Sequence, residues 1–220
     1  MCGRFTQATP GETIAQLFDL SGAPALRPRY NIAPTQPVAV VRSGAGGREL
    51  VELHWGLIPS WAKERAMGAR MINARAETLA EKPAFRAAFR ARRCLIVADG
   101  FYEWQKLGAR KQPWFIRMRD RAPFGFAGLW ERWSGEGEPV ESCTIVTTTP
   151  NEVLEPLHDR MPAIVEPDDF AAWLDPGERD TERLAGLLRP YPAERMEAYR
   201  VGLVVNNPAN DDSRCIEPAA

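Results

Sequence analysis

The sequence has no long apolar run and only a few scattered cysteines, and both absences exclude classes of protein. No stretch of its 220 residues is apolar over the length that a membrane-spanning helix needs. The first residues lack a basic segment followed by an apolar one, so we expect no secretory leader, no membrane and a cytoplasmic location. The cysteines lie too far apart for a zinc knuckle or a redox pair. We therefore expect no metal and no cofactor.

Net charge is also nearly absent. The formal net charge is -1 at pH 7, so the overall charge does not indicate a nucleic-acid-binding protein. Lysine is scarce, and arginine supplies most of the 28 basic residues. Arginine suits bidentate contacts with phosphate, but the codon bias of a GC-rich genome explains much of the excess. The composition leaves room only for a local basic groove.

Strand patterns outnumber helix patterns along the chain. We predict strands at 37–42, 49–55, 94–105, 113–119, 124–132, 142–149, 161–165 and 196–205. We predict helices after the capping pattern Thr9-Pro10-Gly11-Glu12 and at 83–92, 151–157, 168–174 and 180–189. No repeat, low-complexity tract or linker divides the sequence. We therefore expect a single α+β domain over residues 1–220, with a curved, mainly antiparallel sheet or open barrel as its core and peripheral helices.

Cys2 is the first candidate for chemistry. A small residue at position 2 permits removal of Met1, which leaves a cysteine with both a free α-amine and a thiol. Their reference pKa values are roughly 7.7–8.0 and about 8.5, so both are partly available as nucleophiles near neutral pH. With an aldehyde, the amine forms a Schiff base that the thiol closes to a thiazolidine; with an amide, the thiol attacks while the amine acts as base. Taken alone, Cys2 is more simply explained as a buried small residue behind a retained Met1.

Other polar residues could assist, although each also has a purely structural explanation. His158 follows a predicted helix and could transfer protons near neutral pH, or simply end that helix. Glu103 stands between two aromatic residues, where desolvation would raise its pKa. Asn73 and Arg75 would share one face of a strand, where an amide and a guanidinium could hold an oxyanion or a phosphate.

Several separated motifs occur along the chain in a fixed order. They are Cys2-Gly3-Arg4-Phe5, Tyr30-Asn31-Ile32-Ala33-Pro34-Thr35, Trp55-Gly56-Leu57-Ile58-Pro59-Ser60-Trp61, Asn73-Ala74-Arg75-Ala76-Glu77-Thr78, Gly100-Phe101-Tyr102-Glu103-Trp104 and Leu157-His158-Asp159-Arg160-Met161-Pro162. Together these motifs resemble the SOS response-associated peptidase (SRAP) family. The match runs from residue 2 to about 175, and Val204-Val205-Asn206 is also similar.

The resemblance implies a function that composition does not show. Proteins of this family bind single-stranded DNA at abasic sites and crosslink to them, a crosslinking or lyase-type activity that shields the lesion. It implies that Cys2 captures the ring-opened sugar aldehyde as a thiazolidine, that Asn73 orients the amine and the sugar, that Glu103 is the general acid/base and that His158 assists proton transfer. It also implies a monomer whose partner is single-stranded DNA with abasic sites.

The resemblance further implies a DNA-binding surface around these residues. Arg4, Arg75 and Arg160 are the expected phosphate or sugar contacts. Trp61 and Trp104 are the expected stacking groups beside the lesion. Cationic side chains combined with aromatic stacking platforms are typical of single-strand binding.

Three alternatives remain at this point. The first is a cysteine peptidase that removes its own N-terminal residues, with Cys2, Glu103 and His158 as its machinery. The second is an N-terminal-nucleophile glutamine amidohydrolase, since those enzymes also begin Met-Cys-Gly. The third is a non-catalytic single-strand binder in which Cys2 is incidental.

Overall fold

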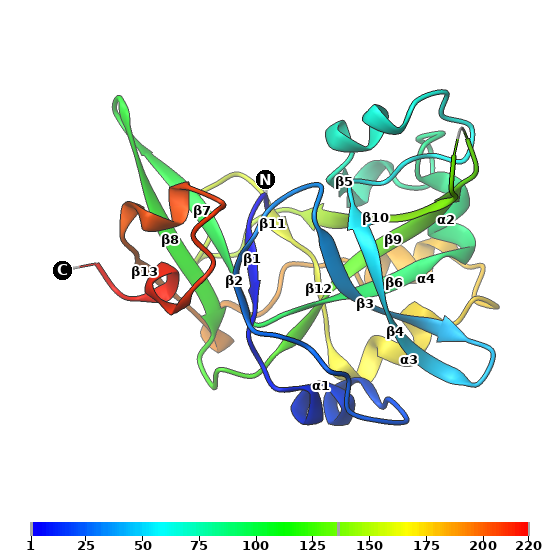
Figure 1. The fold of residues 1–220 in the computed structure, drawn as a ribbon, viewed down its shortest axis with the longest axis horizontal. Helices are drawn as coiled ribbons and strands as arrows, with labels where there is room; N and C mark the ends of the chain where they lie inside the picture. The colour runs from blue at the N-terminus through cyan, green and yellow to red at the C-terminus, as the bar shows by residue number, and fades with distance from the viewer. Residues whose placement is uncertain (1, 136, 220) are drawn as a thin grey trace.

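The computed structural model describes residues 2–135 and 137–219, and the first strand of the chain belongs to a five-stranded antiparallel sheet (Figure 1). The strand order is β13-β8-β7-β1-β2. In this sheet, β7 and β8 form a long hairpin that projects from the body of the molecule. Its strands are β1 (Phe5–Gln7), β2 (Arg29–Ile32), β7 (Gly100–Leu107), β8 (Arg110–Met118) and β13 (Met196–Arg200).

The second sheet closes into a ring. Its strands pair in the order β10-β4-β3-β6-β9, and β9 pairs back onto β10. Most pairs are antiparallel, but β4 and β5 run parallel to β10. The ring strands are β3 (Pro37–Gly44), β4 (Gly47–Trp55), β6 (Arg93–Ala98), β9 (Phe124–Trp133) and β10 (Val140–Thr148), and the added strands are β5 (Asn73–Arg75), β11 (Met161–Pro162) and β12 (Ile164–Val165).

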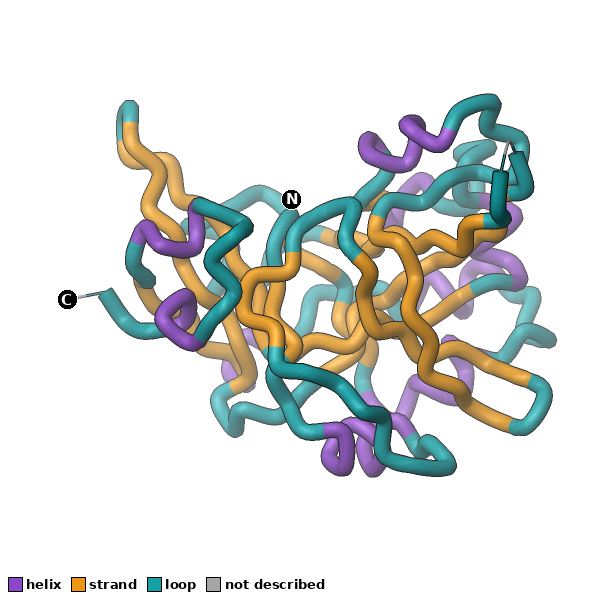
Figure 2. Tube along the Cα trace, in the orientation of Figure 1, coloured by secondary structure: helices purple, strands orange, loops and turns teal. Residues whose placement is uncertain are grey.

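Short helices lie at the periphery of both sheets (Figure 2). The α-helices are α1 (Gly11–Phe18), α2 (Arg86–Ala91), α3 (Phe170–Leu174) and α4 (Thr181–Gly186). The 3₁₀ helices are η1 (Arg65–Arg70), η2 (Ala76–Thr78), η3 (Pro167–Asp169), η4 (Ala193–Arg195), η5 (Leu203–Asn206) and η6 (Ser213–Ile216). Within the described ranges, no helix has both the length and the apolarity needed to cross a membrane. The predicted α+β class, with a barrel-like core and peripheral helices, is confirmed.

Buried aromatic rings join the two sheets. The ring of Phe5 in β1 lies 5.1 Å from Trp55 in β4 and 5.7 Å from Phe126 in β9, measured between centroids. Phe126 also lies 5.8 Å from Phe101 in β7. All four rings are fully buried in one apolar cluster. This packing places the N-terminal strand, and with it Cys2, at the junction of the sheets.

The predicted strand at 94–105 is wrong at its centre, because Asp99 interrupts it. The Asp99 carboxylate accepts the backbone N–H groups of Ala8 and Thr9 at 2.6 and 2.8 Å. It also accepts the Thr9 hydroxyl, which therefore does not cap α1. Gly100 follows because a Cβ there would meet the Phe115 ring at 2.1 Å. The chain divides into β6 and β7, one in each sheet.

Two predicted elements near the C-terminal half also differ. Residues 152–157 form hydrogen-bonded turns rather than the predicted helix. The predicted strand at 196–205 ends at Arg200, and η5 follows it. Both departures bring loop backbone close to β7, beside the candidate site.

Candidate functional site

Cys2 lies just before β1 and is fully buried. The antiparallel register Phe5↔Phe101 and the 3.0 Å bond from the Tyr102 N–H to the Arg4 carbonyl align this segment with β7. Burial raises the pKa of the Cys2 thiol well above its ordinary value, and the nearby charge of Glu103 raises it further. The thiol is therefore protonated at neutral pH and needs a base before it can act as a nucleophile.

Asn73 holds the backbone of Cys2. β5 pairs with β10 in the register Ile145↔Asn73, which fixes the position of Asn73. Its side-chain N–H donates to the Cys2 carbonyl at 2.9 Å. Its Oδ1 is buried and accepts no hydrogen bond within the described part of the chain. An unused buried acceptor beside Cys2 suits an incoming amine or hydroxyl hydrogen.

Glu103 is a buried carboxyl group on β7, with 3% of its surface exposed. Burial raises its pKa from the ordinary 4.5 to about 7. A carboxyl group that titrates near neutral pH can both donate and accept a proton under physiological conditions. Buried Cys2 and Glu103, together with the half-buried Asn73, thus form the centre of the site.

His158 follows the turns at 152–157 and is half-buried. Its Nδ1 accepts the Arg160 backbone N–H at 3.0 Å and lies 2.8 Å from the Asp159 carboxylate. Accepting the hydrogen bond from Arg160 requires an Nδ1 without a proton, whereas donating one to Asp159 requires a protonated Nδ1. Burial lowers the pKa of His158, which favours the neutral ring and therefore the bond from Arg160. His158 lines a cleft of about 760 Å³ together with Trp104 and Lys106.

Arg4 and Trp104 form one unit beside this centre. The Arg4 guanidinium carbon lies 5.6 Å from the centroid of the half-buried Trp104 ring, a cation–π distance. Arg4 Nη1 donates to Asn31 Oδ1 at 2.7 Å and to the Val205 carbonyl at 2.8 Å. The Trp104 indole N–H donates to Asn206 Oδ1 at 2.8 Å. The C-terminal segment therefore fixes both side chains.

Asn31 anchors that C-terminal segment. Its side-chain N–H groups lie 3.2, 3.0 and 2.7 Å from the carbonyls of Val205, Asn207 and Asn210. The side chain of Asn31 is fully buried. The sequence analysis gave Asn31 and Asn206 no role. The one signal for them in the sequence is that each lies in a segment that resembles the family.

Arg75 and Arg160 both lie beside Thr147 of β10. Arg75 pairs with Thr147 by backbone register and is exposed. Arg160 donates to the Thr147 carbonyl at 2.6 Å and binds both carboxylate oxygens of Glu77 at 2.7 and 2.9 Å. A phosphate at Arg160 must therefore compete with Glu77.

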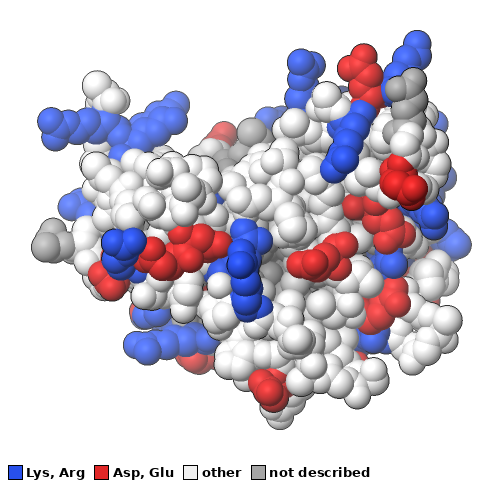
Figure 3. All heavy atoms as spheres, in the orientation of Figure 1, with Lys and Arg blue, Asp and Glu red and all other residues white. Residues whose placement is uncertain are grey.

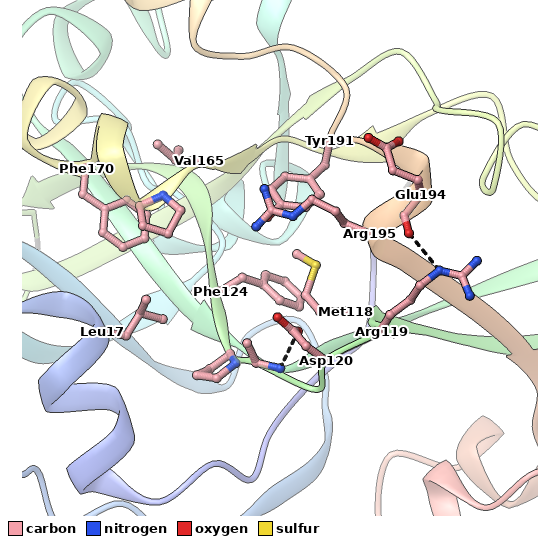
Figure 4. A pocket seen from close by; sticks show the side chains of 13 residues that line it. Leu17, Met118, Arg119, Asp120, Phe124, Val165, Phe170, Tyr191, Glu194 and Arg195 are labelled. Atoms are coloured by element: carbon pink, nitrogen blue, oxygen red, sulfur yellow. Dashed lines mark hydrogen bonds between the residues drawn. The ribbon is translucent and has the colours of Figure 1, made fainter.

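Trp61 is not brought to this centre by any described contact. It is 56% exposed and lines a separate pocket of about 510 Å³ with Lys63, Met67 and Arg70. Another cavity of about 410 Å³ lies between α1, α3 and η4, with Tyr191 and Arg195 in its wall (Figure 4). None of the predicted site residues lines that cavity.

Comparisons with known proteins agree with the motif order. The model of the SOS response associated peptidase (SRAP) family matches residues 1–208. The chain belongs to this family. The protein YoqW of Bacillus subtilis, named an abasic site processing protein, is 44% identical over 222 residues and covers 99% of each chain.

A further relative and a solved structure extend the likeness. HMCES of Xenopus tropicalis, also named an abasic site processing protein, is 32% identical and covers 86% of this chain and 66% of its own. A crystal structure of a protein from Bacteroides thetaiotaomicron superposes with a TM-score of 0.88 at 27% identity, over 100% of both chains. The family resemblance seen in the sequence is therefore confirmed, and the solved structure shares the fold of this chain.

Proposed function

We propose that this protein processes abasic sites in DNA by forming a covalent bond to them through Cys2 after Met1 has been removed. The observation that carries the proposal is the group formed by buried Cys2 and Glu103 with Asn73, which binds the Cys2 carbonyl. The names of the relatives, abasic site processing proteins, support the same substrate. Met1 itself lies outside the described residues.

The first step is attack of the Cys2 α-amine on the aldehyde of the ring-opened sugar. A C–N bond forms, one amine hydrogen passes to the oxygen to give a hydroxyl group, and loss of that hydroxyl as water leaves a protonated imine whose nitrogen keeps its remaining hydrogen. Protonated Glu103 gives the proton that the departing water needs. The free Oδ1 of Asn73 accepts an amine hydrogen and orients the nitrogen.

The second step closes the ring. The thiol gives its proton to Glu103, and the sulfur adds to the carbon of the protonated imine, whose nitrogen becomes neutral and keeps its hydrogen, which gives a thiazolidine. The whole sequence releases one water molecule. Because burial raises the thiol pKa, a base must take that proton, and Glu103 is then the carboxylate beside the sulfur. His158 assists from the cleft.

DNA contacts surround this centre in the proposal. Arg4, Arg75 and Arg160 bind phosphate or sugar, and Trp104 stacks on a base beside the lesion. Trp61 stacks on a more distant base, consistent with its exposed ring. We propose a monomer acting on single strands, because the sugar must reach a buried cysteine and paired, stacked DNA opposes that displacement.

A denaturing gel tests the proposal. The mature protein, mixed with a single-stranded oligonucleotide that carries one abasic site, should give a shifted band that survives denaturation. The band should vanish for Cys2→Ala and for a protein with a blocked N-terminus, and persist for the matched control Cys94→Ala. Intact mass shows whether Met1 is absent. No covalent band under any condition would overturn the proposal.

Self-processing is the second candidate, and the family description as a peptidase favours it. In that case the Cys2 thiol, rather than a cellular aminopeptidase, releases Met1. A Cys2→Ala protein should then retain Met1 by intact mass. Loss of Met1 from that variant assigns the cleavage to the aminopeptidase.

A further inference from the structure

The hairpin of β7 and β8 carries a cluster of cations at its tip. Lys106, Arg110 and Lys111 are all exposed and lie within six consecutive residues (Figure 3, upper left). Lys106 stands directly opposite Lys111 in the strand pairing. Like charges directly opposite each other destabilise a hairpin. Within the described residues, none of the three forms an ion pair.

Apolar packing does not explain this tip either. Leu107, its apolar residue, is 50% exposed. Gly108 has a φ of 61°, the left-handed conformation that the turn of the hairpin requires. A projecting hairpin with uncompensated, mutually repelling charges indicates an anionic partner.

The hairpin also forms one wall of the cleft that contains His158. Lys106 lines this cleft with Trp104, and the Gln105 side-chain N–H donates to the Pro156 carbonyl at 3.2 Å. The cleft holds about 760 Å³ and shares Trp104 and His158 with the candidate site. Glu155 and Asp159 line it on the turn side. Lys106 therefore places a cation on the hairpin wall of the cleft, and the carboxylates lie on the other wall.

We propose that this cleft is a second DNA subsite, which holds the single strand on one side of the abasic site. The phosphates pass Lys106 in the cleft and continue over the hairpin tip to Lys111 and Arg110, away from the carboxylates of Glu155 and Asp159. The strand leaves the site past Trp104. The inference rests on the proposed function and adds the path of the flanking strand.

Salt dependence of binding tests the phosphate contacts. The triple variant Lys106→Gln/Arg110→Gln/Lys111→Gln is compared with wild type on an undamaged single-stranded oligonucleotide, so that no crosslink interferes. Each neutralised phosphate contributes about 0.7 to the slope of log affinity against log salt, so the slope should fall by about 2. The control triple variant Lys82→Gln/Arg86→Gln/Arg90→Gln makes the same change of charge on exposed residues in and beside α2, at the other side of the molecule. Its slope should equal that of wild type.

Lesion position tests the path. With limiting DNA, the hairpin variant should crosslink more slowly than wild type when the flanking nucleotides lie on one side of the abasic site, and at the wild-type rate when they lie on the other. At saturating DNA it should reach the wild-type yield, because the centre around Cys2 is intact. Its melting temperature should equal or exceed that of wild type, since cross-strand repulsion is removed.

An unchanged salt slope, or an equal loss with both lesion positions, overturns the inference. A wild-type protein that binds the undamaged strand but never crosslinks overturns the proposed chemistry instead. The two failures are therefore distinguishable.

Discussion

Burial sets the chemistry of the individual residues at the centre. Cys2 and Glu103 are both buried, and both have pKa values above their ordinary ones. The motif order pointed to each of them, and the aromatic neighbours of Glu103 predicted the direction of its shift. The sequence did not reveal that Asn73 would bind the Cys2 carbonyl, because β5 reaches Cys2 only through its pairing with β10.

Glu103→Gln tests the acid/base role. The amide cannot exchange a proton, so crosslinking should slow by about 10²-fold or more. The wild-type rate should change with an apparent pKa near 7, and that inflection should be absent from the variant. Single-turnover rates between pH 5 and 9, with urea melts to verify folding, are the measurement. An inflection that persists in Glu103→Gln assigns it to another group.

The same residue predicts a pH dependence of stability. Because the folded state holds the Glu103 proton up to about pH 7, whereas an exposed carboxyl loses it near 4.5, this group makes folding less favourable as pH rises between those values. Glu103→Gln should remove this loss. The free energy of unfolding of the variant minus that of wild type should therefore be larger at pH 8 than at pH 4. Urea titrations at the two pH values measure this difference. A constant difference would contradict the shifted pKa.

Asn206→Ala tests how Trp104 is positioned. The variant removes the acceptor of the indole N–H and leaves the ring free to turn on the Arg4 guanidinium. Stacking contributes roughly 1–3 kcal/mol per base, so a partial loss should raise the half-saturating DNA concentration several-fold. The rate at saturating DNA should stay near wild type. Asn207→Ala is the matched control, because within the described residues the Asn207 side chain makes a single hydrogen bond, accepted from the Ala209 N–H.

At the scale of elements, the C-terminal segment is the least predictable part of the fold. Hairpins such as β3–β4 follow from local alternation, and the structure confirms them. The segment from η5 to Asp211 instead depends on Asn31, 174 to 179 residues away in the sequence. No periodicity marks such contacts, because they are single side-chain bonds to loop carbonyls. The predicted 94–105 strand is interrupted for the same reason, because Asp99 binds a residue far away in the sequence, Thr9.

Asn31→Ala should release this segment. The change removes the two buried side-chain N–H donors of Asn31, although each of the carbonyls of Val205, Asn207 and Asn210 keeps one other donor. At about 0.5–1.5 kcal/mol for each lost donor, the variant should lose about 1–3 kcal/mol of stability. Hydrogen exchange should accelerate over 203–211 more than in β3 or β6. Crosslinking should also weaken, because Arg4 loses its Asn31 acceptor. Uniform exchange across the chain would argue against a local anchoring role.

At the scale of the whole molecule, the two sheets share one apolar cluster. Phe126 contacts Phe5 and Phe101 of the first sheet from within the ring of the second. We propose that residues 1–220 act as one domain for this reason. If so, the two sheets cannot unfold separately, and the nucleophile depends on the packing of both.

Phe126→Ala tests this coupling. Truncating a buried phenylalanine should lower the free energy of unfolding by about 3–5 kcal/mol, and Phe126→Leu should lower it less. In both variants, calorimetric and van't Hoff enthalpies should agree, as they do for a single cooperative unit. Crosslinking should decline over the same temperature range as unfolding, because the segment before β1 loses its position when the ring of strands in the second sheet opens. Two separate transitions, with crosslinking lost in only one of them, would show that the sheets fold independently and that the cluster at Phe126 is a contact between domains.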